Sequence, residues 1–165
     1  MRRPEPQVPG PDQESVWDYP RPPALERDDR LVEVRFGGEL VASTTGAYRV
    51  LETSHPPGYY LPPDDVRLDL LVRMPGRSVC EWKGVATYWS VQVGDQTAHD
   101  AAWSYPDPTL AFTAIAGYLS FYPGRVEQVT VGGEVVRPQA GEFYGGWILD
   151  EIVGPFKGDP GTWGW

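Results

Sequence analysis

The stretch that decides the fold class is Leu31-Val32-Glu33-Val34-Arg35-Phe36-Gly37-Gly38-Glu39-Leu40-Val41-Ala42-Ser43. Its first six residues alternate apolar and polar side chains, as a half-buried strand does. The glycine pair supplies the positive φ angles of a tight turn, and the apolar residues after it predict a returning strand. We therefore expect an antiparallel hairpin over residues 31–43.

Similar patterns continue along the chain. A second glycine pair, Gly132-Gly133, lies between the apolar runs 129–131 and 135–136 and predicts a second hairpin. Residues 47–53 and 86–93 have the composition of strands, and the turn at 94–96 leads into a further strand that ends at Trp103. The chain is therefore expected to be mostly β.

One segment has helical spacing. Phe112, Ile115 and Leu119 recur at intervals of three and four residues, which predicts a helix over residues 108–121. Asp107 is a suitable N-cap, and Pro108 suits the first helical position. A shorter helix is expected over residues 64–71, after two prolines.

These patterns predict a compact, single-domain, mostly β protein. Its antiparallel sheets are expected to be tent-like or barrel-like, with one main α-helix packed against them. Residues 1–15 are rich in proline and polar side chains and are expected to be a disordered tail. Residues 16–153 form the expected domain, and residues 154–165 form a C-terminal tail rich in Gly, Pro and Trp.

The charge and the cysteine content limit the partners and the compartment. The net charge is −9, and the 14 Lys and Arg residues are scattered, so we expect neither nucleic acid nor an anionic membrane surface as a partner. The sequence has no apolar run of the roughly 20 residues that a spanning helix needs, and no apolar run follows its first residues. A single cysteine forms no internal disulfide, which is consistent with the cytoplasm. The oligomeric state stays open.

Candidate functional residues gather in three stretches that flank predicted strands. The candidate catalytic residues are Glu52, Lys83 and Cys80. Aromatic side chains with polar tips suit the walls of a ligand pocket, and the candidate ligand-binding residues are Tyr59, Tyr60, Tyr88, Trp103 and Tyr105. Core packing is the competing explanation for at least half of these rings.

Each candidate catalytic residue has more than one interpretation. Lys83 is an anion-binding group, an amine nucleophile tuned by burial, or a surface lysine whose stem lies on Trp82. Glu52 acts as a general base, pairs with Lys83 or Arg49, or is a solvated residue at the end of a strand. Cys80 is a reactive thiol activated by Lys83 or a small buried hydrophobic residue, and burial is the commoner role.

No cofactor or metal is expected. His55, His99 and Cys80 are the only imidazole and thiol groups, and no CxxC pair is present to form a cysteine-type zinc site. The glycine-rich stretches match neither the dinucleotide-binding fingerprint nor a phosphate-binding loop.

Three ordered motifs connect the candidate residues to a known family. They are Val50-Leu51-Glu52 followed by Tyr59-Tyr60-Leu61-Pro62 and Asp65-Val66; Cys80-Glu81-Trp82-Lys83-Gly84-Val85-Ala86-Thr87-Tyr88-Trp89; and Asp100-Ala101-Ala102-Trp103-Ser104-Tyr105-Pro106-Asp107-Pro108. With these motifs the chain resembles the bacterial domain of unknown function 427 family over residues 31–131. It has Glu81 where that family commonly has proline, and Leu61 where the family commonly has phenylalanine.

The resemblance implies a β-rich single domain with tent-like sheets and one helix against them. It also implies one site that contains Glu52, Tyr60, Cys80, Lys83, Tyr88, Trp103 and Tyr105. The family carries a nucleotidyltransferase label, but such enzymes use a spaced acidic pair beside a glycine-serine phosphate motif. The acidic pairs here, 28–29 and 64–65, consist of adjacent residues.

Three functions remain open at this stage. The leading hypothesis is a cytoplasmic domain that binds an unknown small molecule in an aromatic pocket with Glu52 and Lys83. The second is a small enzyme in which Glu52 is the general base and Lys83 binds an anionic substrate. The third is a non-catalytic protein-interaction module whose aromatic residues form the core.

Overall fold

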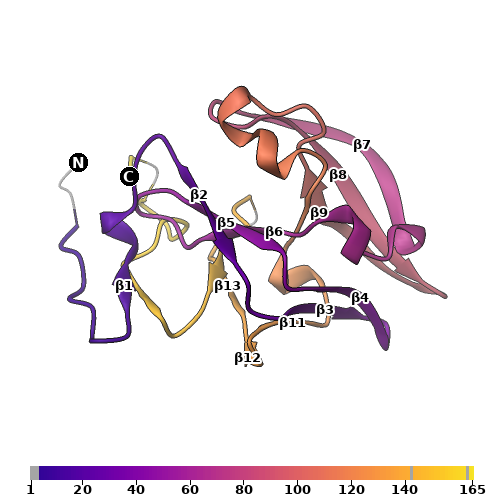
Figure 1. Ribbon diagram of the computed structural model, residues 1–165, viewed down its shortest axis with the longest axis horizontal. Coiled ribbons are helices and arrows are strands. Elements are labelled where there is room, and N and C mark those ends of the chain that lie inside the picture. The colour runs from indigo at the N-terminus through magenta and orange to yellow at the C-terminus, as the bar shows by residue number, and fades with distance from the viewer. Residues whose placement is uncertain (1–3, 142, 163) are drawn as a thin grey trace.

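The computed structural model describes residues 4–141, 143–162 and 164–165, and it is mostly β (Figure 1). The described strands are β1 (Glu14–Ser15), β2 (Ala24–Asp28), β3 (Val32–Phe36), β4 (Glu39–Thr44), β5 (Ala47–Leu51), β6 (Gly58–Tyr60), β7 (Leu71–Cys80), β8 (Gly84–Val93), β9 (Gln96–Ser104), β10 (Leu119–Phe121), β11 (Gln128–Val131), β12 (Glu134–Val135), β13 (Arg137–Pro138), β14 (Trp147–Ile148) and β15 (Ile152–Val153). The helical segments are 3₁₀ turns, namely η1 (Val16–Asp18), η2 (Pro63–Asp65), η3 (Leu68–Leu70), η4 (Leu110–Ile115) and η5 (Pro123–Arg125).

The strands form several small sheets. The two largest have the orders β10-β9-β8-β7 and β12-β11-β3-β4, and a third has the order β2-β5-β6. These pairings are antiparallel, whereas the short pair β1-β15 is parallel. Within the described residues none of the sheets closes into a barrel, so the barrel-like alternative is wrong.

Both predicted glycine hairpins are confirmed. β3 pairs with β4 around Gly37-Gly38, and β11 pairs with β12 around Gly132-Gly133. All four glycines have positive φ angles, between 56° and 87°, which a residue with a Cβ atom adopts only at a cost. β11 also pairs with β3, so the two hairpins join in one sheet.

The expected main α-helix over residues 108–121 is wrong. Only the 3₁₀ segment η4 forms there, with a kink at Phe112, and Leu119 begins strand β10. Thr109 explains the loss of the first turn, because its backbone N–H donates to the carbonyl of Lys83 and its hydroxyl donates to the carbonyl of Trp82. These bonds hold Thr109 extended, at φ −60° and ψ 160°.

The shorter helix expected over residues 64–71 is also wrong. Two separate 3₁₀ turns, η2 and η3, occupy this segment, and Leu71 begins the ten-residue strand β7. The turns are separated by Val66, which is extended and forms a bridge to Ala42. Pairing with the neighbouring strand therefore replaces the helix that the local sequence favours.

Strand β6 joins two packed regions. Leu61, which follows β6, exchanges two backbone hydrogen bonds with Leu119 of β10, at 2.8 and 2.9 Å. Because successive side chains of a strand point to opposite faces, Tyr59 and Tyr60 belong to different clusters. Tyr59 lies in the main core, and Tyr60 lies in a second cluster with Trp103, Tyr105, Phe112 and related residues.

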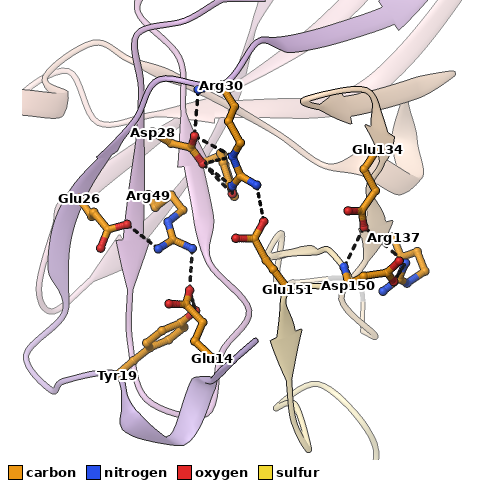
Figure 2. A network of polar contacts seen from close by, with 11 residues as sticks. Glu14, Tyr19, Glu26, Asp28, Arg30, Arg49, Glu134, Arg137, Asp150 and Glu151 are labelled. Carbon is orange, nitrogen blue, oxygen red and sulfur yellow. Dashed lines mark hydrogen bonds and ion pairs between the residues drawn. The ribbon is translucent and has the colours of Figure 1, made fainter. Parts of the chain in front are cut away.

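A network of ion pairs connects the two terminal segments to the sheet of β2 and β5 (Figure 2). The buried Arg49 of β5 pairs with Glu14 at 2.8 Å and Glu26 at 2.5 Å. Arg30 pairs with Asp28 and with Glu151, each at 2.6 Å. Arg49 therefore holds the N-terminal segment against this sheet, and Arg30 holds the C-terminal segment.

The expected tails are partly described. The backbone N–H of Gln7 donates to the carbonyl of Gly154, and residues 14–15 form strand β1 beside β15. Residues 1–3 of the expected N-terminal tail and residue 163 of the expected C-terminal tail lie outside the described residues. The boundaries at 15/16 and 153/154 stay predictions.

Candidate functional site

A pocket of about 200 Å³ brings together most of the candidate residues. Its walls come from the end of β5, from β6, from the end of β7, from β8 and β9, and from the segment after β13. Seven of the eight candidates line it, namely Glu52, Tyr60, Cys80, Lys83, Tyr88, Trp103 and Tyr105. Their catalytic or binding roles stay predictions, but their positions form one site.

Tyr59 is the candidate that does not line the pocket. Its ring stacks on the ring of Trp147, with the centroids 4.6 Å apart and the planes 10° apart. Its hydroxyl donates to Asp28 at 3.2 Å. Tyr59 is thus a core residue with a satisfied hydroxyl, as the alternation along β6 requires.

A buried hydrogen bond connects two rings of the aromatic wall. Trp103 of β9 donates its indole N–H to the hydroxyl of Tyr60, at 3.1 Å. The Tyr60 oxygen accepts this bond, so its own proton is available to an acceptor in the pocket. Tyr122 packs on Trp103 with the ring centroids 4.6 Å apart and extends the wall.

Lys83 lies in the turn between β7 and β8, and its ammonium group projects over the ring of Tyr105, 5.6 Å from the centroid. It forms no ion pair with a described carboxylate. The two hydrogen bonds from Thr109 fix the backbone of this turn. Burial lowers the pKa of Lys83, but Tyr60, Cys80 and Glu52 outweigh it, and the pKa lies above its ordinary value. Lys83 is therefore a charged ammonium group at neutral pH.

Glu52 follows β5 and pairs with Arg21, at 3.2 Å from Nη2 to Oε2. Its carboxylate also lies 4.0 Å from Nδ1 of His55. The structure thus differs from the expected pairing with Lys83 or Arg49, since neither residue forms an ion pair with Glu52 among the described contacts. Lys83 and Glu52 give the pocket two separate charges of opposite sign.

The remaining polar groups of the pocket are mainly hydroxyls. Tyr88 shares a hydrogen bond of 2.7 Å with Ser78 of β7. Burial, followed by the neighbouring phenols, raises the pKa of Tyr105 and of Tyr122, so both keep their protons. The Tyr122 hydroxyl donates to the carbonyl of Phe143 at 3.0 Å. Cys80 is a free, half-buried thiol on the same wall. The pocket therefore combines the ammonium group of Lys83 with protonated phenols.

The sequence interpretation missed one wall of the pocket. Gln139, Tyr144, Gly145 and Gly146 line it. A Cβ atom on Gly145 would lie 2.2 Å from Cη2 of Trp103, so only glycine lets the backbone approach the indole this closely. The usable signal is a glycine pair between aromatic residues, at 143–147. Residue 142 lies outside the described residues.

His55 is a further pocket residue that was not among the candidates. It lines the pocket, and its ring contacts Tyr144 edge to face with the centroids 5.6 Å apart. Burial lowers the pKa of His55, and the positive charges of Lys157 and Arg21 act in the same direction, against the opposing effect of Glu52. His55 is therefore neutral at physiological pH.

The described residues contain no group of three His, Cys, Asp or Glu side chains placed to hold a metal ion. They also contain no helix with the length and apolarity that crossing a bilayer requires.

Comparison with known families connects this pocket to a defined domain. The sequence profile described as Domain of unknown function (DUF427) matches residues 24–132, well over half of the chain. The chain belongs to the DUF427 family. The DUF427 match contains all seven candidates that line the pocket, whereas the wall formed by Gln139 and residues 143–146 lies beyond it. No curated protein matches the chain.

Proposed function

We propose that this DUF427 protein binds a small anionic molecule in the aromatic pocket, with Lys83 holding the negative charge. The observation that carries the proposal is the position of Lys83, whose ammonium group enters an aromatic pocket without a carboxylate partner among the described residues. A cation withdrawn from water favours a bound anion. Its raised pKa supports an anion-binding role over an amine nucleophile, which would need the uncharged form.

The size and polarity of the pocket restrict the ligand further. A volume of about 200 Å³ holds a compact molecule, roughly seven groups of the size of a water molecule. The rings of Trp103, Tyr60 and Tyr105 offer faces and edges to a planar, largely apolar body. Glu52, which also lines the pocket, offers acceptors to a hydrogen-bond donor of the ligand. A small planar acid with one N–H or O–H donor fits these features.

Matched acid and amide probes test this proposal. Benzoate and nicotinate differ from benzamide and nicotinamide mainly in charge, so ligand-observed NMR with the four compounds isolates the contribution of Lys83. We expect the acids to bind at least about tenfold more tightly than the amides. Lys83→Met should remove this preference, and Arg27→Met, which removes an exposed cation from β2 outside the pocket lining, should keep it. Equal binding of acids and amides to the wild-type protein contradicts the proposal.

A second candidate function is a small enzyme that uses Glu52 as general base and Lys83 as anion binder. The observation that favours it is that both groups line one pocket while Arg21 holds the Glu52 carboxylate in place. Glu52→Gln separates the two functions. In both cases the variant should keep its affinity for acids. Only an enzyme has a turnover to lose, and Glu52→Gln should abolish it.

A further inference from the structure

Strand β7 places an open sheet edge beside the pocket. It is the last strand in the order β10-β9-β8-β7, and none of the described strands pairs with its outer side. Ser78, Val79 and Cys80 all line the pocket, although successive side chains of a strand point to opposite faces. The pocket therefore reaches the main chain at the end of β7, a strand whose outer side is unpaired among the described strands. An exposed edge of this kind can accept an added strand.

The same strand is positively charged. β7 contains Arg73 and Arg77 and has no carboxylate, in a chain whose net charge is −9. Both arginines are exposed, and neither side chain forms an ion pair or hydrogen bond with any described residue. They border a shallow hollow beside Thr87, where residues 74–76 bulge out of the pairing with β8. This edge thus complements a negatively charged partner.

The distance along β7 between Arg77 and the pocket sets where a bound peptide would meet each of them. A strand rises about 3.3 Å per residue, so Arg77 lies roughly 10 Å before Cys80 along β7. Consider an extended peptide that lies parallel to β7 with its C-terminus in the pocket. The residue about three positions before that C-terminus then lies beside Arg77. Phe143, which lines the pocket and is 61% exposed, offers an apolar surface to the side chain that enters.

We propose that the edge of β7 binds the C-terminal segment of an acidic peptide by strand addition. The peptide runs parallel to β7, its terminal carboxylate contacts Lys83, and an Asp or Glu about three residues upstream pairs with Arg77. This inference rests on the proposed function, because it identifies the anion in the pocket as a peptide C-terminus.

A peptide library tests the inference. Peptides of about eight residues, randomised near the C-terminus, are offered to the immobilised protein as free acids and as C-terminal amides. We expect free acids to be retained at least about tenfold over amides, with Asp or Glu enriched near the third position from the end. Bound peptide should also slow amide hydrogen exchange at residues 77–80, because their edge groups gain partners.

Variants separate the parts of the proposal. Arg77→Gln should abolish the enrichment of acidic residues while the preference for free acids persists, and Lys83→Met should abolish that preference. Arg27→Gln is the matched control, because it removes an exposed arginine from β2, in a different sheet, and it should change neither result.

Equal retention of free acids and amides overturns the peptide proposal. If benzoate still binds in a Lys83-dependent manner, the small-molecule function stands and only the peptide inference fails. If benzoate does not bind in a Lys83-dependent manner either, both the small-molecule function and the peptide inference are wrong. Free-acid preference without slower exchange at residues 77–80 overturns the strand-addition part.

Discussion

Trp103 and Tyr60 are joined across the pocket wall by a buried hydrogen bond of 3.1 Å, which connects β9 to β6. Trp103 also contacts Tyr122 and the backbone of Gly145. The Trp103 side chain therefore contacts three walls of the pocket. Substitutions of its neighbours should change both the stability of the protein and its affinity for a ligand.

Tyr60→Phe should destabilise the protein by about 1–3 kcal/mol, because the indole N–H of Trp103 loses its acceptor in a buried position. Chemical denaturation of the wild type and the variant measures this difference. Tyr88→Phe is the control, since the partners Tyr88 and Ser78 are only part-buried and water can replace the lost hydroxyl. Equal losses in the two variants would contradict the buried hydrogen bond.

Gly145→Ala should destabilise the protein by about 1–3 kcal/mol through overpacking against Trp103. The near-ultraviolet circular dichroism of the tryptophans should change as well, because the indole must move. In Gly124→Ala the new methyl group lies 3.6 Å from Pro138, an ordinary contact, so this control should be almost neutral. An unchanged spectrum and stability for Gly145→Ala would show that segment 143–146 does not pack against the indole.

The ion-pair network should make the protein sensitive to acid. Burial raises the pKa of Glu14, but hydrogen bonds from Tyr19 and Arg49 outweigh it and the pKa lies below its ordinary value of 4.5. The pKa of Asp28 is likewise lowered below 3.8, because bonds from Arg30 outweigh burial. Between the ordinary and the folded-state pKa values of these two carboxyl groups, the unfolded state binds more protons than the folded state. The stability that the groups contribute is therefore present above their ordinary pKa values and is lost as the pH falls through their folded-state values.

Denaturation at a series of pH values, from about 6 to about 2, should show this loss. Arg49→Met should reduce the slope because it removes a partner of Glu14. Arg35→Met, which changes an arginine in an exposed pair with Glu33, should leave the slope intact. A slope that is the same in all three proteins would exclude Glu14 as a source of the acid sensitivity.

His55 should add a second step at higher pH. Since burial lowers its folded pKa from 6.5, the stability it contributes is present above 6.5 and lost as the pH falls through the folded value. His55→Gln should therefore flatten the stability profile below about pH 6.5. His99→Gln removes an exposed histidine and should keep the profile. A profile that depends on His99 and not on His55 would contradict the buried position of His55.

The sequence predicted the hairpins well because glycine pairs between alternating strands leave few other conformations. The helix over 108–121 failed because its spaced apolar residues serve different elements. Phe112 and Ile115 pack into the second cluster, with Tyr60 and Trp103, whereas Leu119 and Phe121 of β10 lie in the main core. A local pattern does not reveal that β9 needs another strand at its edge.

Two parts of the site region were beyond the sequence patterns. Strand β7 was hidden because Pro75 and Gly76 break its alternation, and in the structure they form a bulge that keeps the strand in the sheet. The wall formed by Gln139 and residues 143–146 was hidden because this segment has neither strand alternation nor helical spacing. The candidates that converge, Glu52, Lys83 and Trp103, all lie at or near strand ends, where loops gather.

The central claim is that Lys83 binds an anion in the aromatic pocket, and native mass spectrometry of the protein purified from cells tests it most directly. We expect the wild type to carry a small bound molecule that is lost on denaturation. Lys83→Met should lack this molecule, while its unfolding free energy changes by less than about 1 kcal/mol because no ion pair is broken. Arg27→Met, which removes a cation outside the pocket, should retain the molecule. An identical bound species in the wild type and in Lys83→Met, or no bound species in the wild type together with no preference for acids over amides, would contradict the account.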